Sequence, residues 1–205
     1  GETEYGDISK IKLDTMLYRK AKDIVSVGDY VTFSGEPFQM GELLCGRSFD
    51  DRSAVVCLLE VAKRLSGKDL PCNVCFVLSD GEELGLRGIR TASFKINPDE
   101  AVAVDVSFGD GPDISPDDCG KLGQGGMIGI SPALSKKVSQ ELIDIAKQNN
   151  IPYQLEVMGS STGTNADMIS ITRDGVKTAA LSIPLRNMHT EVETLNIKDL
   201  EAVCD

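Results

Sequence analysis

Apolar and polar positions alternate along this chain in two rhythms, one typical of helices and one typical of strands. Residues 54–65 carry apolar side chains at helical spacing, and Gly67 stands just past their end. The same periodicity predicts further helices over residues 86–94, 132–148, 165–173 and 196–203. Short apolar runs predict strands over residues 26–33, 74–78, 101–106, 153–158 and 177–183, the last broken by Pro184.

The order of these elements predicts the fold class. From about residue 47, strands alternate with helices, which favours an α/β fold with a mostly parallel sheet and helices on both faces. Residues 1–46 differ, because their one alternating run is bounded by glycines and has no helix beside it. We therefore expect a short β segment over residues 1–46 and a three-layer α/β/α domain over residues 47–205.

Composition and charge narrow the function classes. The chain has 205 residues, 41% of them hydrophobic, and a formal net charge of −11, so the basic surface of a nucleic-acid-binding protein is not expected. Its apolar runs are shorter than the roughly 20 residues that cross a bilayer. Cys57, Cys72 and Cys75 fall inside helical or strand patterns, which indicates buried, reduced thiols and a cytoplasmic protein.

Candidate chemical groups collect where strands are predicted to end. Glu82 and Glu83 follow one apolar run, Asp105 ends another, Asp50 precedes the first helix, and His189, the single histidine, follows the last strand. Ligands of open α/β sheets bind at the carboxyl ends of the strands, so these groups are expected at one site. Carboxylates with one imidazole suit zinc, cobalt or manganese.

Each of these residues also has a plain structural interpretation. Asp50 could cap the helix that follows it, the glutamate pair could simply be solvated, and His189 could be an ordinary hydrogen-bonded histidine. Asp105 between two valines is harder to explain this way, because burying an unpaired carboxylate is costly. The placement of all five after successive strands favours a site.

Five ordered motifs resemble those of the M42 metallo-aminopeptidases, the group that includes the tetrahedral aminopeptidases. They are Ser48-Phe49-Asp50-Asp51-Arg52, Asp80-Gly81-Glu82-Glu83-Leu84-Gly85-Leu86-Arg87-Gly88, Ala103-Val104-Asp105-Val106, Gly163-Thr164-Asn165-Ala166-Asp167 and Ile183-Pro184-Leu185-Arg186-Asn187-Met188-His189. The resemblance covers residues 1–205.

The resemblance implies a role for each candidate. Asp50 would bridge two divalent ions, zinc or cobalt; Glu83 and His189 would complete the ligands of one, and Asp105 would bind the other. Glu82 would be the general base, moving a proton from the metal-bridging water to the leaving amine. Peptides would be the substrates, and the full-length form would be a homo-oligomer.

The chain departs from the family pattern at one ligand. The family supplies a further metal histidine from an early strand, whereas His189 is the only histidine here. The resemblance then implies one well-held ion, impaired activity, a remnant of the family's inserted β domain over residues 1–46, and a catalytic domain over residues 47–205 that is incomplete at both ends.

Two other functions remain open from the residues. The first is a non-catalytic fragment or assembly subunit, which the absent histidine would favour. The second is a glycoside hydrolase, suggested by the paired Glu82 and Glu83. That chemistry needs two carboxyl groups flanking a sugar, whereas adjacent side chains at a strand end diverge.

Overall fold

The computed structural model describes residues 20–32, 34–112 and 114–205, which fall into two units, Gly1–Ser34 and Gly35–Asp205. In the first unit, Ala21–Asp23 form a short 3-10 helix, η2. The strand predicted over residues 26–33 is wrong for the residues described. The Asp29 N–H donates to the Ser26 carbonyl, and the Ser26 N–H donates to the Asp29 carboxylate, closing a turn. Phe33 lies outside the described residues.

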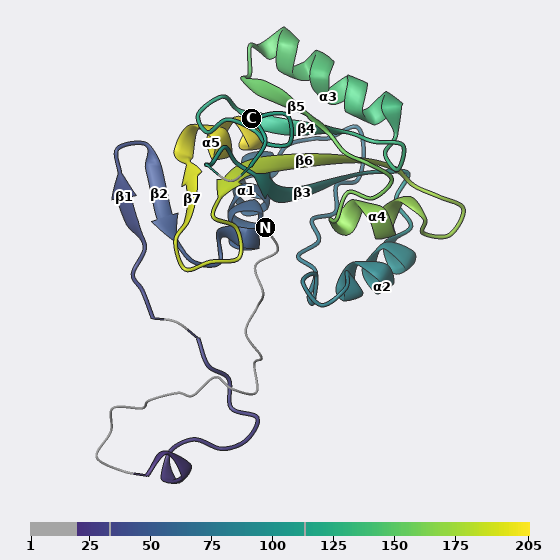
Figure 1. Cartoon of the computed structure of the whole chain (residues 1–205). Helices are drawn as coiled ribbons and strands as arrows, with labels where there is room; N and C mark the ends of the chain where they lie inside the picture. The colour runs from purple at the N-terminus through teal and green to yellow at the C-terminus, as the bar shows by residue number, and fades with distance from the viewer. Residues whose placement is uncertain (1–19, 33, 113) are drawn as a thin grey trace. The chain divides into compact units, whose positions relative to one another are not determined.

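The second unit is built on one sheet, whose seven strands in the described part of the chain are shown in Figure 1. They run in the order β1-β2-β7-β6-β4-β5, and β3 also pairs with β6. The bounds are β1 Phe38–Met40, β2 Leu43–Gly46, β3 Glu100–Phe108, β4 Gly126–Ile130, β5 Tyr153–Val157, β6 Lys177–Arg186 and β7 Glu193–Asn196. β1 and β2 thus lie in the second unit, although the predicted domain boundary follows residue 46.

The sheet is mixed. Its two longest ladders, β3 with β6 and β4 with β5, are parallel, whereas the shorter β1–β2, β2–β7, β4–β6 and β6–β7 ladders are antiparallel. The α/β class is confirmed, but the sheet is mixed rather than mostly parallel, because the antiparallel β4–β6 ladder joins the two parallel pairs.

Helices cover both faces of the sheet, as the strand pattern predicts. The helices are α1 Phe49–Leu65, α2 Arg87–Ile96, α3 Lys136–Asn149, α4 Asn165–Ser170 and α5 Ile197–Cys204. On one face, Cys57 of α1 and Val203 of α5 pack with Val106 and Ile183 from the sheet. On the other, Ile89 of α2 and Ile169 of α4 pack with Ala103 and Ala180. Because neighbouring strand residues point to opposite faces, β3 and β6 serve both layers.

Two helices differ at their ends from the periodic pattern. α3 begins at Lys136, later than predicted, because the Ser135 hydroxyl accepts from the Val138 N–H and caps it there. α4 ends at Ser170 rather than at Arg173. No helix in the described part of the chain is long and apolar enough to cross a membrane.

β6 runs through Pro184 instead of ending before it. On one side, Pro184 lies opposite Ser107 of β3. On the other side, the ladder to β4 includes Ser182, and the ladder to β7 begins at Leu185. Pro184 therefore falls where the neighbour changes, a place where a missing N–H costs no ladder hydrogen bond.

The buried strand predicted over residues 74–78 is wrong. These residues carry no strand, and Val74 and Leu78 are about half exposed, at 48% and 53%. Together with α1, α2 and β3, the run lines a cavity of about 780 Å³. In the described part of the chain β3 pairs with β6 alone, so the apolar run lacks the hydrogen-bonded neighbour that a strand requires.

Candidate metal centre

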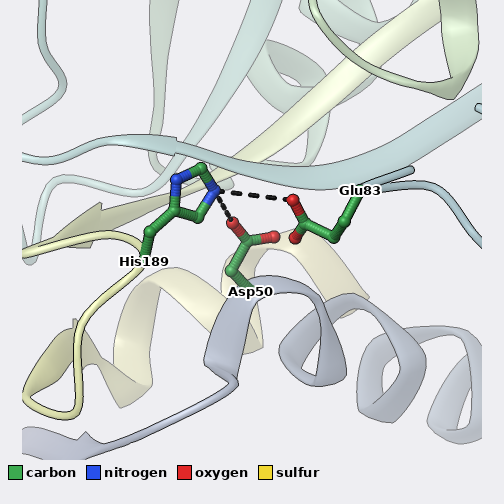
Figure 2. Close-up of side chains that lie close together, drawn as sticks. All are labelled: Asp50, Glu83 and His189. Atoms are coloured by element: carbon green, nitrogen blue, oxygen red, sulfur yellow. Dashed lines mark ion pairs between the residues drawn. The ribbon is translucent and has the colours of Figure 1, made fainter. Parts of the chain in front are cut away.

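Three of the five predicted site residues meet at one edge of the sheet. Figure 2 shows the imidazole of His189 facing the carboxylates of Asp50 and Glu83. His189 Nε2 lies 2.9 Å from Asp50 Oδ2 and 3.6 Å from Glu83 Oε2. One ligand atom from each residue lies within 4.8 Å of the other two, and no other such cluster occurs among the described residues. A nitrogen and two carboxylate oxygens at this spacing suit a divalent ion.

Asp50 is held at the junction between β2 and α1. Asp50 and Asp51 are counted in α1 but have non-helical backbone angles, so the regular helix starts after them. Asp51 Oδ1 accepts the Ala54 N–H at 3.1 Å and acts as the cap. The capping interpretation therefore applies to Asp51, which leaves the Asp50 carboxylate facing His189 and Glu83.

Glu83 is placed by a tight turn ahead of α2. The Glu82 carbonyl accepts from the N–H groups of Gly85 and Leu86, and the Asp80 carbonyl accepts from Gly88. A β-carbon on Gly88 would come within 2.4 Å of that carbonyl oxygen, so the turn closes only around glycine. Such closure fixes the direction in which the Glu83 side chain leaves the backbone.

Asp105 and Glu82 lie beside the cluster of three rather than in it. Asp105 is 7% exposed on β3, and the Val106 N–H donates to its carboxylate at 2.9 Å. Burial, together with the charge of Glu82, raises the pKa of Asp105 to about 7. Burial and the neighbouring Glu83 also raise the pKa of Glu82.

The site concentrates negative charge in a poorly solvated place. Burial and the charge of Glu83 raise the pKa of Asp50 to about 6, with His189 acting against them. Burial and the charge of Asp105 raise the pKa of Asp51 to about 9. A bound cation offsets the repulsion between buried carboxylates of this kind. The electrostatics of the site therefore favour a divalent cation, as its donor atoms do.

The sequence pattern missed Asp51 and Glu193. Asp51 adjoins a predicted ligand, and only its burial beside Asp105 distinguishes it. Glu193 is 2% exposed on β7, and its carboxylate accepts the N–H groups of Phe49, Asp50 and His189. Its position four residues after His189 was visible in the sequence, but nothing there marked it as buried.

Several known proteins are similar to this chain in sequence or in fold. The sequence profile of the M42 glutamyl aminopeptidases matches residues 1–205. The lysyl aminopeptidase of Pyrococcus furiosus is 38% identical over 152 residues, covering 74% of this chain and 43% of that protein.

Two solved structures are similar as well. Aminopeptidase APDkam598 of Desulfurococcus kamchatkensis aligns with a TM-score of 0.76 and 32% identity, over 82% of this chain and 49% of its own. The TET1 peptidase of Pyrococcus horikoshii aligns with a TM-score of 0.76 and 32% identity, over 90% of this chain and 55% of its own.

The chain spans about half the length of the relatives it matches, between 43% and 55% in these three cases. The match of the family profile nonetheless extends across all 205 residues, and it includes Asp50, Glu83 and His189 of the candidate metal centre. The chain belongs to the M42 glutamyl aminopeptidase family.

Proposed function

We propose that this chain carries the metal centre of an aminopeptidase that removes N-terminal residues from peptides. The observation that carries the proposal is the convergence of Asp50, Glu83 and His189 within 4.8 Å of one another. The lysyl aminopeptidase named among the relatives supports the reaction class.

Asp50, Glu83 and His189 would hold one divalent ion, zinc or cobalt, as three protein ligands. When bound, such an ion polarises the scissile carbonyl and makes water a stronger acid. The donor set does not separate the two metals, because carboxylate and imidazole suit both.

We propose Asp50 and Asp105 as the ligands of a second ion, held more weakly because it has two protein ligands. Its weak binding would impair turnover by this chain. The same shortage of ligands supports a second candidate function, that of a non-catalytic subunit or fragment of the family.

Glu82 would act as the general base. It lies beside the ligand Glu83 without belonging to the cluster, so its carboxylate is free to take a proton from the attacking water and pass it to the leaving amine. Its raised pKa supports this role, because a more basic carboxylate takes a proton from water more readily.

Further parts of the proposal concern the whole protein. The TET1 peptidase of P. horikoshii assembles into a tetrahedron or an octahedral shell, which supports a homo-oligomer. All six cysteines are free, which supports a cytoplasmic location, although Cys72 and Cys75 are exposed rather than buried as predicted. We propose residues 1–46 as the remnant of an inserted dimerisation domain and residues 47–205 as the catalytic domain.

Counting bound ions tests the proposal. The metal-free chain is titrated with zinc or cobalt, excess ion is removed, and the ions left per chain are counted. One ion, lost in Glu83→Ala and in His189→Ala but retained in Glu191→Ala, is the expected result. Two tightly held ions would overturn the weak second site, and no ion would overturn the metal centre. If peptidase activity survives complete removal of metal, the metal-dependent mechanism is wrong.

A further inference from the structure

Glu193 is buried, and its carboxylate accepts hydrogen bonds from the backbone of the two segments that carry Asp50 and His189. Oε2 accepts the Phe49 N–H at 2.6 Å and the Asp50 N–H at 3.2 Å. Oε1 accepts the His189 N–H at 2.8 Å. One side chain thus ties together two segments that lie 139 positions apart in the sequence, from Asp50 to His189.

Both segments contain strained backbone that must be held in place. His189 has a left-handed backbone, with φ at 63°, as does Ser48 beside Phe49, with φ at 58°. A left-handed conformation is strained for a residue other than glycine, so it persists only where the surroundings hold it. Three backbone N–H groups that donate to one carboxylate can hold these segments in place.

Glu193 itself is fixed by the sheet. It begins β7, pairs with Gly46 of β2, and is 2% exposed. A β-carbon on Gly46 would come within 3.0 Å of the Phe49 ring, so the backbone between β2 and α1 is also closely packed. The carboxylate therefore joins the two ligand segments from a rigid base.

We propose that Glu193 is a positioning residue, which sets the separation of Asp50 and His189 and so determines how tightly and in what geometry the metal is held. It contacts neither the ion nor the substrate. The inference rests on the proposed function, because it assumes the ion held by Asp50, Glu83 and His189.

The test is a titration of the metal-free 205-residue chain with cobalt(II), read by the visible absorption of the bound ion and by competition with a chromogenic chelator. Glu193→Gln keeps the size of the side chain but turns one acceptor into a donor that faces an N–H. We expect its cobalt Kd to rise about 10- to 100-fold, with an altered absorption spectrum, as for other residues that orient metal ligands.

Glu193→Asp separates geometry from charge. It keeps the carboxylate but is one methylene shorter, so it cannot reach both segments as Glu193 does. We expect the cobalt Kd to rise about tenfold. If the charge alone mattered, this variant would bind as the unaltered chain does. It also provides the test if Glu193→Gln does not fold.

Two matched controls exclude general effects. Glu191→Gln removes one charge from an exposed position in the same loop. Asp199→Asn alters another fully buried carboxylate, which accepts the N–H groups of Gly123 and Gly125 at 2.7 Å. We expect the second control to lower the unfolding temperature, and both to leave the cobalt Kd within about twofold.

The outcomes separate the two proposals. Cobalt binding to the unaltered chain, with both Glu193 variants within twofold of it in Kd and spectrum, would overturn the positioning role alone. A rise in Kd of the same size in Asp199→Asn would also overturn it, because the effect would then follow stability. Absence of cobalt binding to the unaltered chain would overturn the proposed metal centre, and the positioning role with it.

Discussion

Glu82 and Glu83 adjoin in the sequence, yet their surroundings differ. Glu83 is 55% exposed and lies 3.6 Å from His189 Nε2, whereas Glu82 is partly buried and lies outside the ligand cluster. Only Glu83 belongs to the cluster, so it can bind an ion while Glu82 stays free for proton transfer.

This difference between Glu82 and Glu83 predicts that two equally small substitutions have different effects. Glu82→Gln removes the base, so we expect a 10²- to 10⁴-fold lower rate of residue release with metal binding unchanged. Glu83→Gln removes a ligand charge, so we expect weaker metal binding first. Hydrolysis of a panel of aminoacyl p-nitroanilides, with metal content measured on the same samples, distinguishes them. Loss of metal from Glu82→Gln would show that Glu82 is a ligand and not the base.

The candidate site residues that the sequence predicts lie in motifs that occur in a fixed order along the chain. Asp50, Glu83 and His189 were predictable because ordered motifs mark them, and the structure brings them together. Asp51 and Glu193 were not, because their environment comes from burial and from contacts with distant backbone. Periodicity describes which face of an element a residue occupies, but not what packs over it.

At the scale of elements, the loop between β3 and β4 shows how a single glycine can be required. Gly125 has φ at 93°, and a β-carbon there would come within 2.0 Å of the Pro152 carbonyl oxygen. Its N–H donates to Asp199 of α5 at 2.7 Å. The loop is therefore fixed to both a helix and the segment before β5.

Gly125→Ala should destabilise the fold by about 3 kcal/mol or more, since the left-handed backbone and the clash with rigid backbone add. Gly159→Ala is the control, because a β-carbon there meets nothing within 4 Å and its φ is ordinary. Urea denaturation of both variants measures the difference. Equal midpoints for the two would show that this loop shifts freely to accept a side chain.

The packing and pairing of individual elements explain which of them the sequence predicts well. The long helix α1 and the strand β3 were predicted because the spacing of their apolar residues matches the positions that are buried in the fold. The run over residues 74–78 has a strand-like composition but no hydrogen-bonded neighbour in the described part of the chain, and composition cannot supply one. Pro184 was expected to end β6. The strand continues through it, because Pro184 lies where the neighbouring strand changes from β4 to β7.

At the scale of the whole molecule, the metal centre joins segments that are far apart in the chain. Asp50 lies just before the regular turns of α1, Glu83 precedes α2, and His189 follows β6, so an ion held by all three would act as a cross-link in the folded state. An ion that binds the folded state only stabilises it by about 2.7 kcal/mol at 100 times its Kd. Until an ion is bound, the repulsion between the carboxylates at this site destabilises the folded state.

The last prediction concerns how this charge makes stability depend on pH. Folding raises the pKa of Asp50 to about 6, of Asp105 to about 7 and of Asp51 to about 9, from an ordinary value of 3.8. A raised carboxyl pKa means that the folded state binds protons more tightly than the unfolded state. The stability that this tighter proton binding contributes is fully present below pH 3.8 and is lost as pH rises through the raised pKa.

The metal-free chain should therefore unfold at a lower temperature at pH 9 than at pH 5, with the decline spread over that whole window. Asp51→Asn should flatten its upper part, because Asp51 has the highest of the three values and the amide oxygen can still cap Ala54. Saturating zinc should reverse most of the decline, since a bound cation favours the ionised carboxylates. Thermal unfolding at several pH values, with zinc or with a chelator, measures all three effects. A metal-free chain that becomes more stable from pH 5 to pH 9 would show that these carboxylates are not buried together, and the electrostatic argument for the metal centre would fail with them.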